Sequence, residues 1–269
     1  MEEKIYTTTS GNVHYWVDAP NPALPWMVFI PGLTADHTLF APQLAFFAGK
    51  ANVFTWDAPA HAASRPYPLD FTMDDYARIL HDIFAVEGVE RPVYVGQSLG
   101  GYIGQVYLDL FPGSFAGFVS VDSAPLQRRY YQAWELAALE RTYRMYVSIP
   151  WKLLVEWGAR GVSCTPAGQA NMREMMSKYD RLEFCRLAAH GYRMLARAAK
   201  ADRPYVIDCQ ALLLCGEHDA AGSTKRYNRA WHETGGLPLE WVPGAGHNST
   251  IDAPEYVNAC IEEFAAAIA

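Results

Sequence analysis

A serine flanked by glycines is the clearest candidate for chemistry in this chain. In the segment Gly96-Gln-Ser98-Leu-Gly100, the serine follows an apolar run and precedes a stretch of helical character. The glycines two positions before and after the serine allow a sharp turn between strand and helix, so that the hydroxyl stands above the edge of a sheet. A hydroxyl in that position is a typical nucleophile for acyl transfer when a base and an acid accompany it.

His247 and Asp219 are the predicted base and acid. His247 lies in a glycine-containing loop after the last predicted strand, and Asp219 comes four residues after the apolar strand that precedes it. A carboxylate there can accept a hydrogen bond from the histidine Nδ1 atom and hold the useful tautomer. Glu217 and Asp122 also follow predicted strands and are the alternative candidates for the acid.

Two backbone amides are predicted to bind the negative charge that develops on the substrate oxygen. Leu99 begins the helix after Ser98, where amides have no partner within the helix. Leu33 follows Pro31-Gly32 at the end of a predicted strand. A tight turn at this glycine lets the amide of Leu33 face the serine, so Leu33 and Leu99 together would form an oxyanion hole.

Short apolar runs alternate with helical patterns, which predicts an α/β fold with a mostly parallel, doubly wound sheet. The expected strands are 3–8, 12–18, 26–31, 51–57, 92–97, 117–122, 210–215 and 238–243. The expected helices outside the middle of the chain are 38–48, 73–87, 99–111, 223–234 and 252–267, the last with Asp252 as its N-terminal cap. The first two strands, joined by a Ser10-Gly11-Asn12 turn, suit an antiparallel hairpin at the sheet edge.

Residues 126–203 interrupt this alternation. They contain four helical patterns and no strand pattern, so the sequence predicts a helical insertion in a core made of 1–125 and 204–269. The helical patterns are 128–147, 151–160, 166–178 and 181–200. Their aromatic residues pack the insertion onto the core, line a substrate pocket, or both. The candidate pocket residues are Trp134, Tyr143 and Trp151 from the insertion and His37 from a loop of the core.

Charge is distributed unevenly along the chain. The formal net charge is −7, but residues 126–203 contain 14 basic and 7 acidic residues, a net charge of +7. The acidic remainder would repel nucleic acid, so no nucleic-acid partner is expected. The basic insertion is explained by solvated helix faces, or by attraction of an anionic substrate or an acidic carrier protein.

Composition excludes several other classes of protein. A hydrophobic content of 51% is sufficient for a sizeable core, and no apolar run approaches the length of a membrane span. The first ten residues contain no apolar stretch of a signal peptide, so a cytoplasmic protein without membrane contact is expected. The five cysteines form no C-x-x-C pair, and neither a metal nor a cofactor is predicted. The oligomeric state is not indicated.

The order Ser98, Asp219, His247 in these contexts resembles the α/β-hydrolase fold superfamily. The segment Trp56–Pro66 also resembles the family's D-x-P-G-H-G-x-S stretch, with alanines in place of its glycines. The resemblance covers nearly the whole chain. It implies an eight-stranded mixed sheet, helices on both faces, and a helical lid after the sixth strand, which is where residues 126–203 lie.

These observations favour a serine hydrolase that cleaves a small-molecule carboxylic ester through an acyl-enzyme. A serine nucleophile argues against haloalkane dehalogenases and epoxide hydrolases of this fold, which use a carboxylate. The alternatives are a carbon–carbon bond hydrolase, or a thioesterase or carrier-protein ester hydrolase, acting on an anionic substrate. A further alternative is a ligand-binding scaffold without turnover, because fold does not determine function.

Overall fold

The computed structural model describes residues 1–268, and Ala269, the end of the predicted core range, lies outside them. Its centre is an eight-stranded sheet with the order β1-β2-β4-β3-β5-β6-β7-β8. β2 runs antiparallel to β1 and β4, and the remaining neighbours are parallel. The strands are β1 (Glu2–Thr7), β2 (Asn12–Asp18), β3 (Trp26–Ile30), β4 (Asn52–Trp56), β5 (Val93–Gln97), β6 (Gly117–Val121), β7 (Gln210–Gly216) and β8 (Leu239–Val242). The predicted mostly parallel sheet and its edge hairpin are confirmed.

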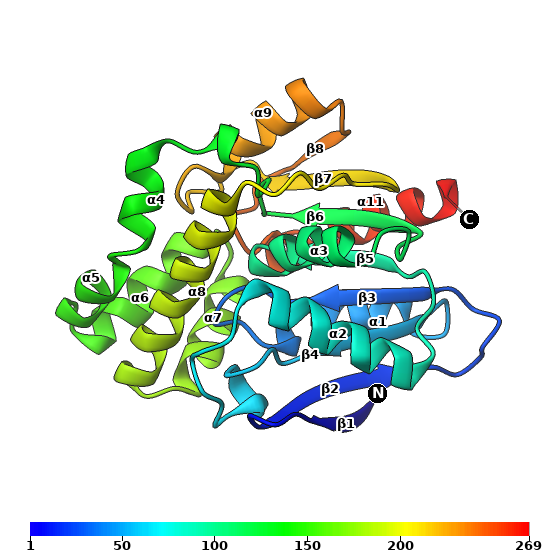
Figure 1. Cartoon of the computed structure of the whole chain (residues 1–269), viewed down its shortest axis with the longest axis horizontal. Coiled ribbons are helices and arrows are strands. Elements are labelled where there is room, and N and C mark those ends of the chain that lie inside the picture. Colours follow the sequence, from blue (N-terminus) through cyan, green and yellow to red (C-terminus); the bar gives the residue numbers. More distant parts are fainter. Residues whose placement is uncertain (269) are drawn as a thin grey trace.

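Helices cover both faces of the sheet, as Figure 1 shows. One face packs against α2 (Met73–Glu87), α3 (Leu99–Leu110) and α9 (Thr224–Gly235), and the other packs against α1 (Ala41–Phe47) and α11 (Pro254–Ala267). Every residue of β4, β5 and β6 is buried. This explains why these strands read as continuous apolar runs rather than as alternating patterns.

The segment between β6 and β7 forms helices that lie beyond the carboxyl ends of the parallel strands (Figure 1). It contains η3 (Arg128–Tyr130), α4 (Ala133–Leu139), α5 (Thr142–Ser148), α6 (Trp151–Val162), α7 (Pro166–Ser177) and α8 (Arg181–Ala201). We call residues 126–203 the helical segment. Within residues 1–268, no helix is long and apolar enough to cross a membrane.

Three helix predictions need correction. The expected helix 38–48 is divided into η1 (His37–Phe40) and α1. The expected helix 128–147 is divided into three, because the backbone amide of Gln132 donates to the carboxylate of Glu135 and starts α4 anew. The expected helix 252–267 is also divided: α10 (Ser249–Asp252) ends at Asp252, and α11 begins at Pro254. Asp252 is therefore not a helix cap, and its carboxylate bonds to the helical segment instead.

Helix α3 lies so close to β3 that its first turn tolerates no side chain at Gly100. A Cβ atom there would overlap the backbone carbonyl of Ile30. Backbone cannot move away as a flexible side chain can, so we expect Gly100→Ala to lower the free energy of unfolding by at least about 2 kcal/mol.

Chemical denaturation followed by circular dichroism measures this effect. Gly161→Ala in α6 is the matched control, because open space surrounds that position. The control replaces a helical glycine by alanine and should stabilise the protein by about 0.5–1 kcal/mol. Equal unfolding midpoints for the two variants would contradict the close approach of α3 to β3.

Candidate active site

Ser98 occupies a sharp turn between β5 and α3. Its φ of 48° and ψ of −111° lie outside the regions that L-residues favour. The turn closes because Gly96 and Gly100 lack side chains: a Cβ on Gly96 would come within 2.5 Å of the backbone of Gly100. The Ser98 amide donates to the Val121 carbonyl at 2.9 Å, and the Ser123 hydroxyl donates to the Ser98 carbonyl at 2.7 Å. The backbone of the serine is thus held on both sides.

His247 connects Ser98 to Asp219. Its Nε2 atom lies 3.0 Å from Ser98 Oγ, and its Nδ1 atom lies 2.8 Å from Asp219 Oδ2. The Asp219 side chain is fully buried, and its other oxygen accepts the amide of Ala221 at 2.8 Å. Ser98 and His247 lie 149 positions apart in the sequence. The three residues that the sequence singled out nevertheless form one continuous chain of hydrogen bonds.

The loop that carries His247 is held by a hydrogen bond from β5, the strand that leads into Ser98. Gln97, which immediately precedes Ser98, donates from Nε2 to the His247 carbonyl at 2.8 Å. The next residue, Asn248, donates its amide to the Val162 carbonyl at 2.7 Å. The histidine loop thus contacts both the core and the end of α6.

Asp122 lies behind the acid and the base rather than beside Ser98. One of its oxygens accepts the amide of Gly216 at 2.7 Å, and the other accepts the amide and hydroxyl of Ser249 at 3.0 and 2.5 Å. Gly216 precedes the loop of Asp219, and Ser249 follows His247. A single buried carboxylate therefore joins the two loops on which the acid and the base lie.

Burial dominates the electrostatics of this group of side chains. Burial, and then the negative charge of Asp219, raise the pKa of Asp122 to about 7. Burial also lowers the pKa of His247, but the charge and hydrogen bond of Asp219 and the charge of Asp122 outweigh it. The pKa of His247 is consequently raised above its ordinary value.

The alternative acid Glu217 is far more exposed than Asp219. Slightly more than half of its side chain is accessible (57%), and a carboxylate oxygen accepts the amide of Gly244 at 3.2 Å. Among the candidates for the acid, Asp219 is the one whose carboxylate bonds to His247.

The residues predicted to form an oxyanion hole lie next to Ser98. Leu99 is the first residue of α3, and a Cβ on Gly32 would lie 3.1 Å from Ser98 Cβ. Leu33 and Leu99 both line the cavity that contains Ser98 and His247. The side chain of Leu33 packs against Gly191 of α8, where a Cβ would overlap it.

Two cavities meet at Ser98 and His247. The inner chamber has a volume of about 160 Å³ and lies between the core and helices α6, α7 and α8. The outer chamber has a volume of about 350 Å³ and lies between α4, α5, α8 and the loop before α9. Residues particular to the inner chamber include Leu33, Leu154, Met172, Met176, Phe184 and Ala188. Residues particular to the outer chamber include Tyr131, Trp134, Glu135, Ala138, Ser223 and Tyr227.

Of the four candidate pocket residues, Trp134 lines the outer chamber, whereas His37, Tyr143 and Trp151 line neither. The ring of Trp151 packs 5.4 Å from that of Phe184 and so supports the wall of the inner chamber from behind. Tyr143 is partly buried against the hydrophobic core. Both predictions are corrected for the same reason: an apolar face at helical spacing indicates burial and does not distinguish a wall from its support.

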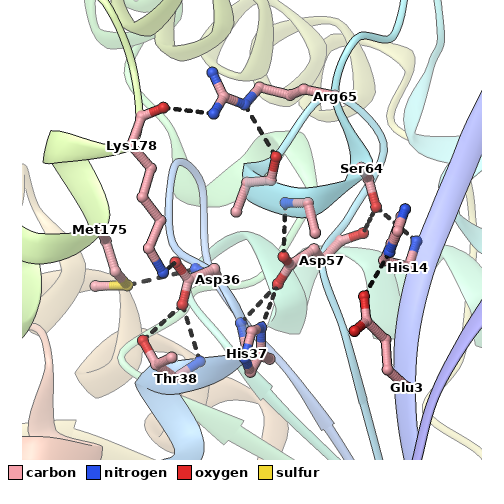
Figure 2. A network of polar contacts seen from close by, with 12 residues as sticks. Glu3, His14, Asp36, His37, Thr38, Asp57, Ser64, Arg65, Met175 and Lys178 are labelled. Carbon is pink, nitrogen blue, oxygen red and sulfur yellow. Dashed lines mark hydrogen bonds and ion pairs between the residues drawn. The ribbon is translucent and has the colours of Figure 1, made fainter.

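His37 belongs to a polar network between the core and the helical segment, which Figure 2 shows. Its Nδ1 atom lies 2.9 Å from Asp57 Oδ1, and its ring stacks on Trp16 with centroids 3.7 Å apart. The neighbouring Asp36, almost fully buried, bonds to Lys178 of the helical segment at 2.6 Å. His37 therefore orders this loop and takes no part in the chambers.

Two groups of side chains bring three ligand-type atoms close together. One comprises Asp36, His37 and Asp57, and the other comprises Asp122, Cys215 and Asp219. The carboxylates of both groups already accept hydrogen bonds from protein donors. In both groups the carboxylates are therefore engaged by donors of the protein itself.

The basic residues of the helical segment do not line the cavities. Among the described residues, no lysine or arginine borders the inner or the outer chamber. Arg128 bonds to the Tyr131 carbonyl, and the guanidinium of Arg129 lies over the ring of Tyr130. Glu135, which borders the outer chamber, is paired with Arg226 at 2.6 Å.

Sequence reasoning missed Gln97, Tyr146 and Tyr192 as residues that shape the site, and it considered Asp122 only as an alternative acid. Gln97 occupies the variable position of the glycine–serine motif, where nothing in the pattern indicates a contact with His247. The loop-joining role of Asp122 depends on strand order. Tyr146 and Tyr192 line both chambers but lie 46 positions apart in a generally aromatic segment.

Two curated relatives match this chain over most of its length. A 25% identical relative, named "Putative carbamate hydrolase RutD", from Cronobacter turicensis, covers 91% of this chain and 92% of its own. A 23% identical relative from Klebsiella pneumoniae, 2-succinyl-6-hydroxy-2,4-cyclohexadiene-1-carboxylate synthase, covers 93% of this chain and 97% of its own.

Solved structures share the fold. A thermophilic esterase from Thermogutta terrifontis superimposes with a TM-score of 0.72 at 20% identity, over 100% of this chain and 99% of its own. The family model described as "Alpha/beta hydrolase family" matches residues 27–259, which is most of the chain. The sheet order, the serine turn and this match agree, and the chain belongs to the alpha/beta hydrolase family.

Proposed function

We propose that this protein is a serine hydrolase of carboxylic esters, with Ser98 as nucleophile, His247 as base and Asp219 as acid. The observation that carries the proposal is the continuous set of contacts from Ser98 Oγ through the imidazole to the buried Asp219 carboxylate. A serine at a strained turn with this support matches the geometry that acyl transfer requires.

The first half of the reaction forms an acyl-enzyme. Ser98 Oγ attacks the ester carbonyl carbon while His247 Nε2 takes the hydroxyl proton. The amides of Leu33 and Leu99 donate to the resulting oxyanion, and Asp219 stabilises the imidazolium. The carbon–oxygen bond to the alcohol then breaks, and His247 gives its proton to the leaving oxygen.

The second half regenerates the enzyme. Water attacks the acyl carbon, and His247 takes a proton from the attacking water molecule. When the bond to Ser98 breaks, the same proton returns to Oγ and the carboxylic acid departs. No step needs a metal or a cofactor.

Esters are favoured over the other candidate substrates by the surroundings of Ser98. A carbon–carbon bond hydrolase or a carrier-protein hydrolase for an anionic substrate would need a cation near the bound ligand, and no arginine or lysine borders either chamber in the described part of the chain. The similarity to a solved esterase is consistent with ester cleavage. A non-catalytic scaffold would not need the histidine to contact both Ser98 and Asp219.

Ser98→Ala tests the nucleophile. The substitution removes one hydroxyl from a turn and leaves the core intact, so hydrolysis of p-nitrophenyl esters should fall on the order of 10⁴-fold or more. A fluorophosphonate probe should label the wild-type protein on Ser98 and leave the variant unlabelled, as measured by intact mass. Turnover at the wild-type rate in a folded Ser98→Ala protein would refute the assignment.

Asp219→Asn tests the acid against its neighbour Glu217. The amide favours the wrong histidine tautomer, so kcat should fall by about 10³- to 10⁴-fold. The control, Glu217→Gln, keeps an acceptor oxygen at an exposed position and should change kcat by less than about twofold. A larger loss in Glu217→Gln than in Asp219→Asn would show that the acid is misassigned.

Asp122→Asn tests the electrostatic support of His247. His247 must be neutral to accept the serine proton, so kcat/KM should fall as the pH drops through its raised pKa. Because the pKa of Asp122 is raised to about 7, Asp122 carries a charge only in the upper part of the range over which His247 titrates. That charge stabilises the imidazolium, so its removal should move the upper part of the acidic limb of the pH profile to lower pH. A lower kcat with an unmoved limb would indicate that Asp122 acts by loop positioning alone.

A further inference from the structure

The two chambers differ in their access to solvent. The residues that line the inner chamber are buried or partly buried, and none of them is exposed. The outer chamber includes the exposed residues Trp134, Ala138 and Gly222, so it opens to solvent. The outer chamber is therefore the more open of the two, and a group bound there has the more direct route to solvent.

Tyr146 and Tyr192 stand between the chambers. Both residues line both cavities. Their rings stack with centroids 6.1 Å apart and an angle of 16°, and the Tyr146 hydroxyl donates to the Tyr192 hydroxyl at 3.3 Å. Two stacked rings joined at their hydroxyl ends form a stiff partition, so each side of Ser98 accepts a different part of a substrate.

The order of events in acyl transfer assigns the two parts. The alcohol departs first, while the acyl group stays on the serine until water arrives. The more open chamber suits the alcohol, and the less open chamber, whose lining has no exposed residue, suits the acyl group. Leu33 and Leu99, whose amides would hold the carbonyl oxygen, border the inner chamber and not the outer one. The acyl carbon consequently lies on the inner side.

Volume and chemistry limit the acyl group. The inner chamber of about 160 Å³ resembles in size an apolar cavity of about 150 Å³ that holds benzene, which corresponds to about six carbon atoms. Its particular walls are side chains such as Leu154, Met172, Met176 and Phe184. No lysine or arginine of the described chain borders it, so a carboxylate there would be desolvated without a cation.

We propose that the inner chamber is the acyl site. It selects esters whose acyl group is aliphatic or aryl, bears no charge and has about six carbon atoms. This inference rests on the proposed function. The outer chamber receives the alcohol, whose polar groups meet the hydroxyl-bearing Thr142, Ser223 and Tyr227. The protein thus selects substrates by the charge and size of the acyl group, and it accepts a wider range of alcohol groups.

Gly158 of α6 offers a way to fill the inner chamber. It borders that chamber, and a Cβ there would lie 3.2 Å from the sulfur of Met176, a flexible side chain. Gly158→Leu improves helix propensity while it occupies acyl space. Ala138→Leu is the matched control, since Ala138 lies on α4 in the outer chamber. Gly158→Ala is a milder variant for use if the leucine is not accommodated.

The experiment measures kcat/KM for p-nitrophenyl acetate, hexanoate and decanoate with each protein. The wild-type protein should prefer hexanoate to decanoate by at least about tenfold. Gly158→Leu should lower the ratio of kcat/KM for hexanoate to that for acetate by at least about tenfold, whereas Ala138→Leu should keep the wild-type ratio. The kcat/KM for methyl hexanoate should exceed that for monomethyl adipate by at least about tenfold. The acyl group of monomethyl adipate has the same length but ends in a carboxylate.

Three results would overturn the acyl-site proposal. They are an optimum at decanoate, a larger change of acyl preference in Ala138→Leu than in Gly158→Leu, and equal rates for methyl hexanoate and monomethyl adipate. Labelling of Ser98 by hexyl- and decylphosphonate esters separates this failure from that of the proposed function. Labelling without chain-length preference refutes the acyl site alone, whereas absence of both labelling and ester cleavage refutes the hydrolase assignment.

Discussion

The strained turn at Ser98 is the constraint on which the rest of the site depends. A non-glycine residue in such a conformation costs on the order of 1–3 kcal/mol and persists when its surroundings hold it. Here β6 accepts the serine amide through Val121, and Ser123 donates to the serine carbonyl. The glycines around the turn let α3 approach the strands closely enough for these contacts. These contacts use the backbone of Ser98, and its hydroxyl is directed to His247.

Buried carboxylates extend this support to the loops and to the helical segment. Asp122, which directly follows β6, holds the loops of Asp219 and His247 together. Asp252 does the same between layers: it accepts the amide of Gly246, beside His247, and the hydroxyls of Ser163 and Thr165 after α6. The helical segment is thereby fastened to the histidine loop itself. A movement of these helices would shift the loop of His247, so access to the chambers and the position of the imidazole are connected.

The strands, and the grouping of Ser98, Asp219 and His247 at one end of the sheet, could be predicted because local rules determine them. Continuous apolar runs indicate buried strands, and a glycine–serine motif at the strand–helix junction indicates the turn. The chambers could not be predicted in the same way. Trp134 and Trp151 look alike in the sequence, and whether a ring lines a cavity or supports its wall depends on how α4, α6 and α8 pack. The division of helix 128–147 likewise depends on the side chain of Glu135, which competes for backbone donors.

Part of the positive charge of the helical segment faces acidic side chains of the core. Lys178 bonds to the buried Asp36, and Arg203, at the end of the segment, lies within ion-pair distance of Asp74 and Asp109. The pairs of Arg203 are partly exposed, and exposed ion pairs contribute only about 0–1 kcal/mol each. Their stronger effect is on orientation, because opposite charges on the two faces disfavour other placements of the helices over the sheet. The cations are thus used at the periphery, where water solvates them, and the space beside Ser98 stays neutral. A desolvated apolar acyl group is compatible with that arrangement, whereas an anionic one would need the arginines to move inward.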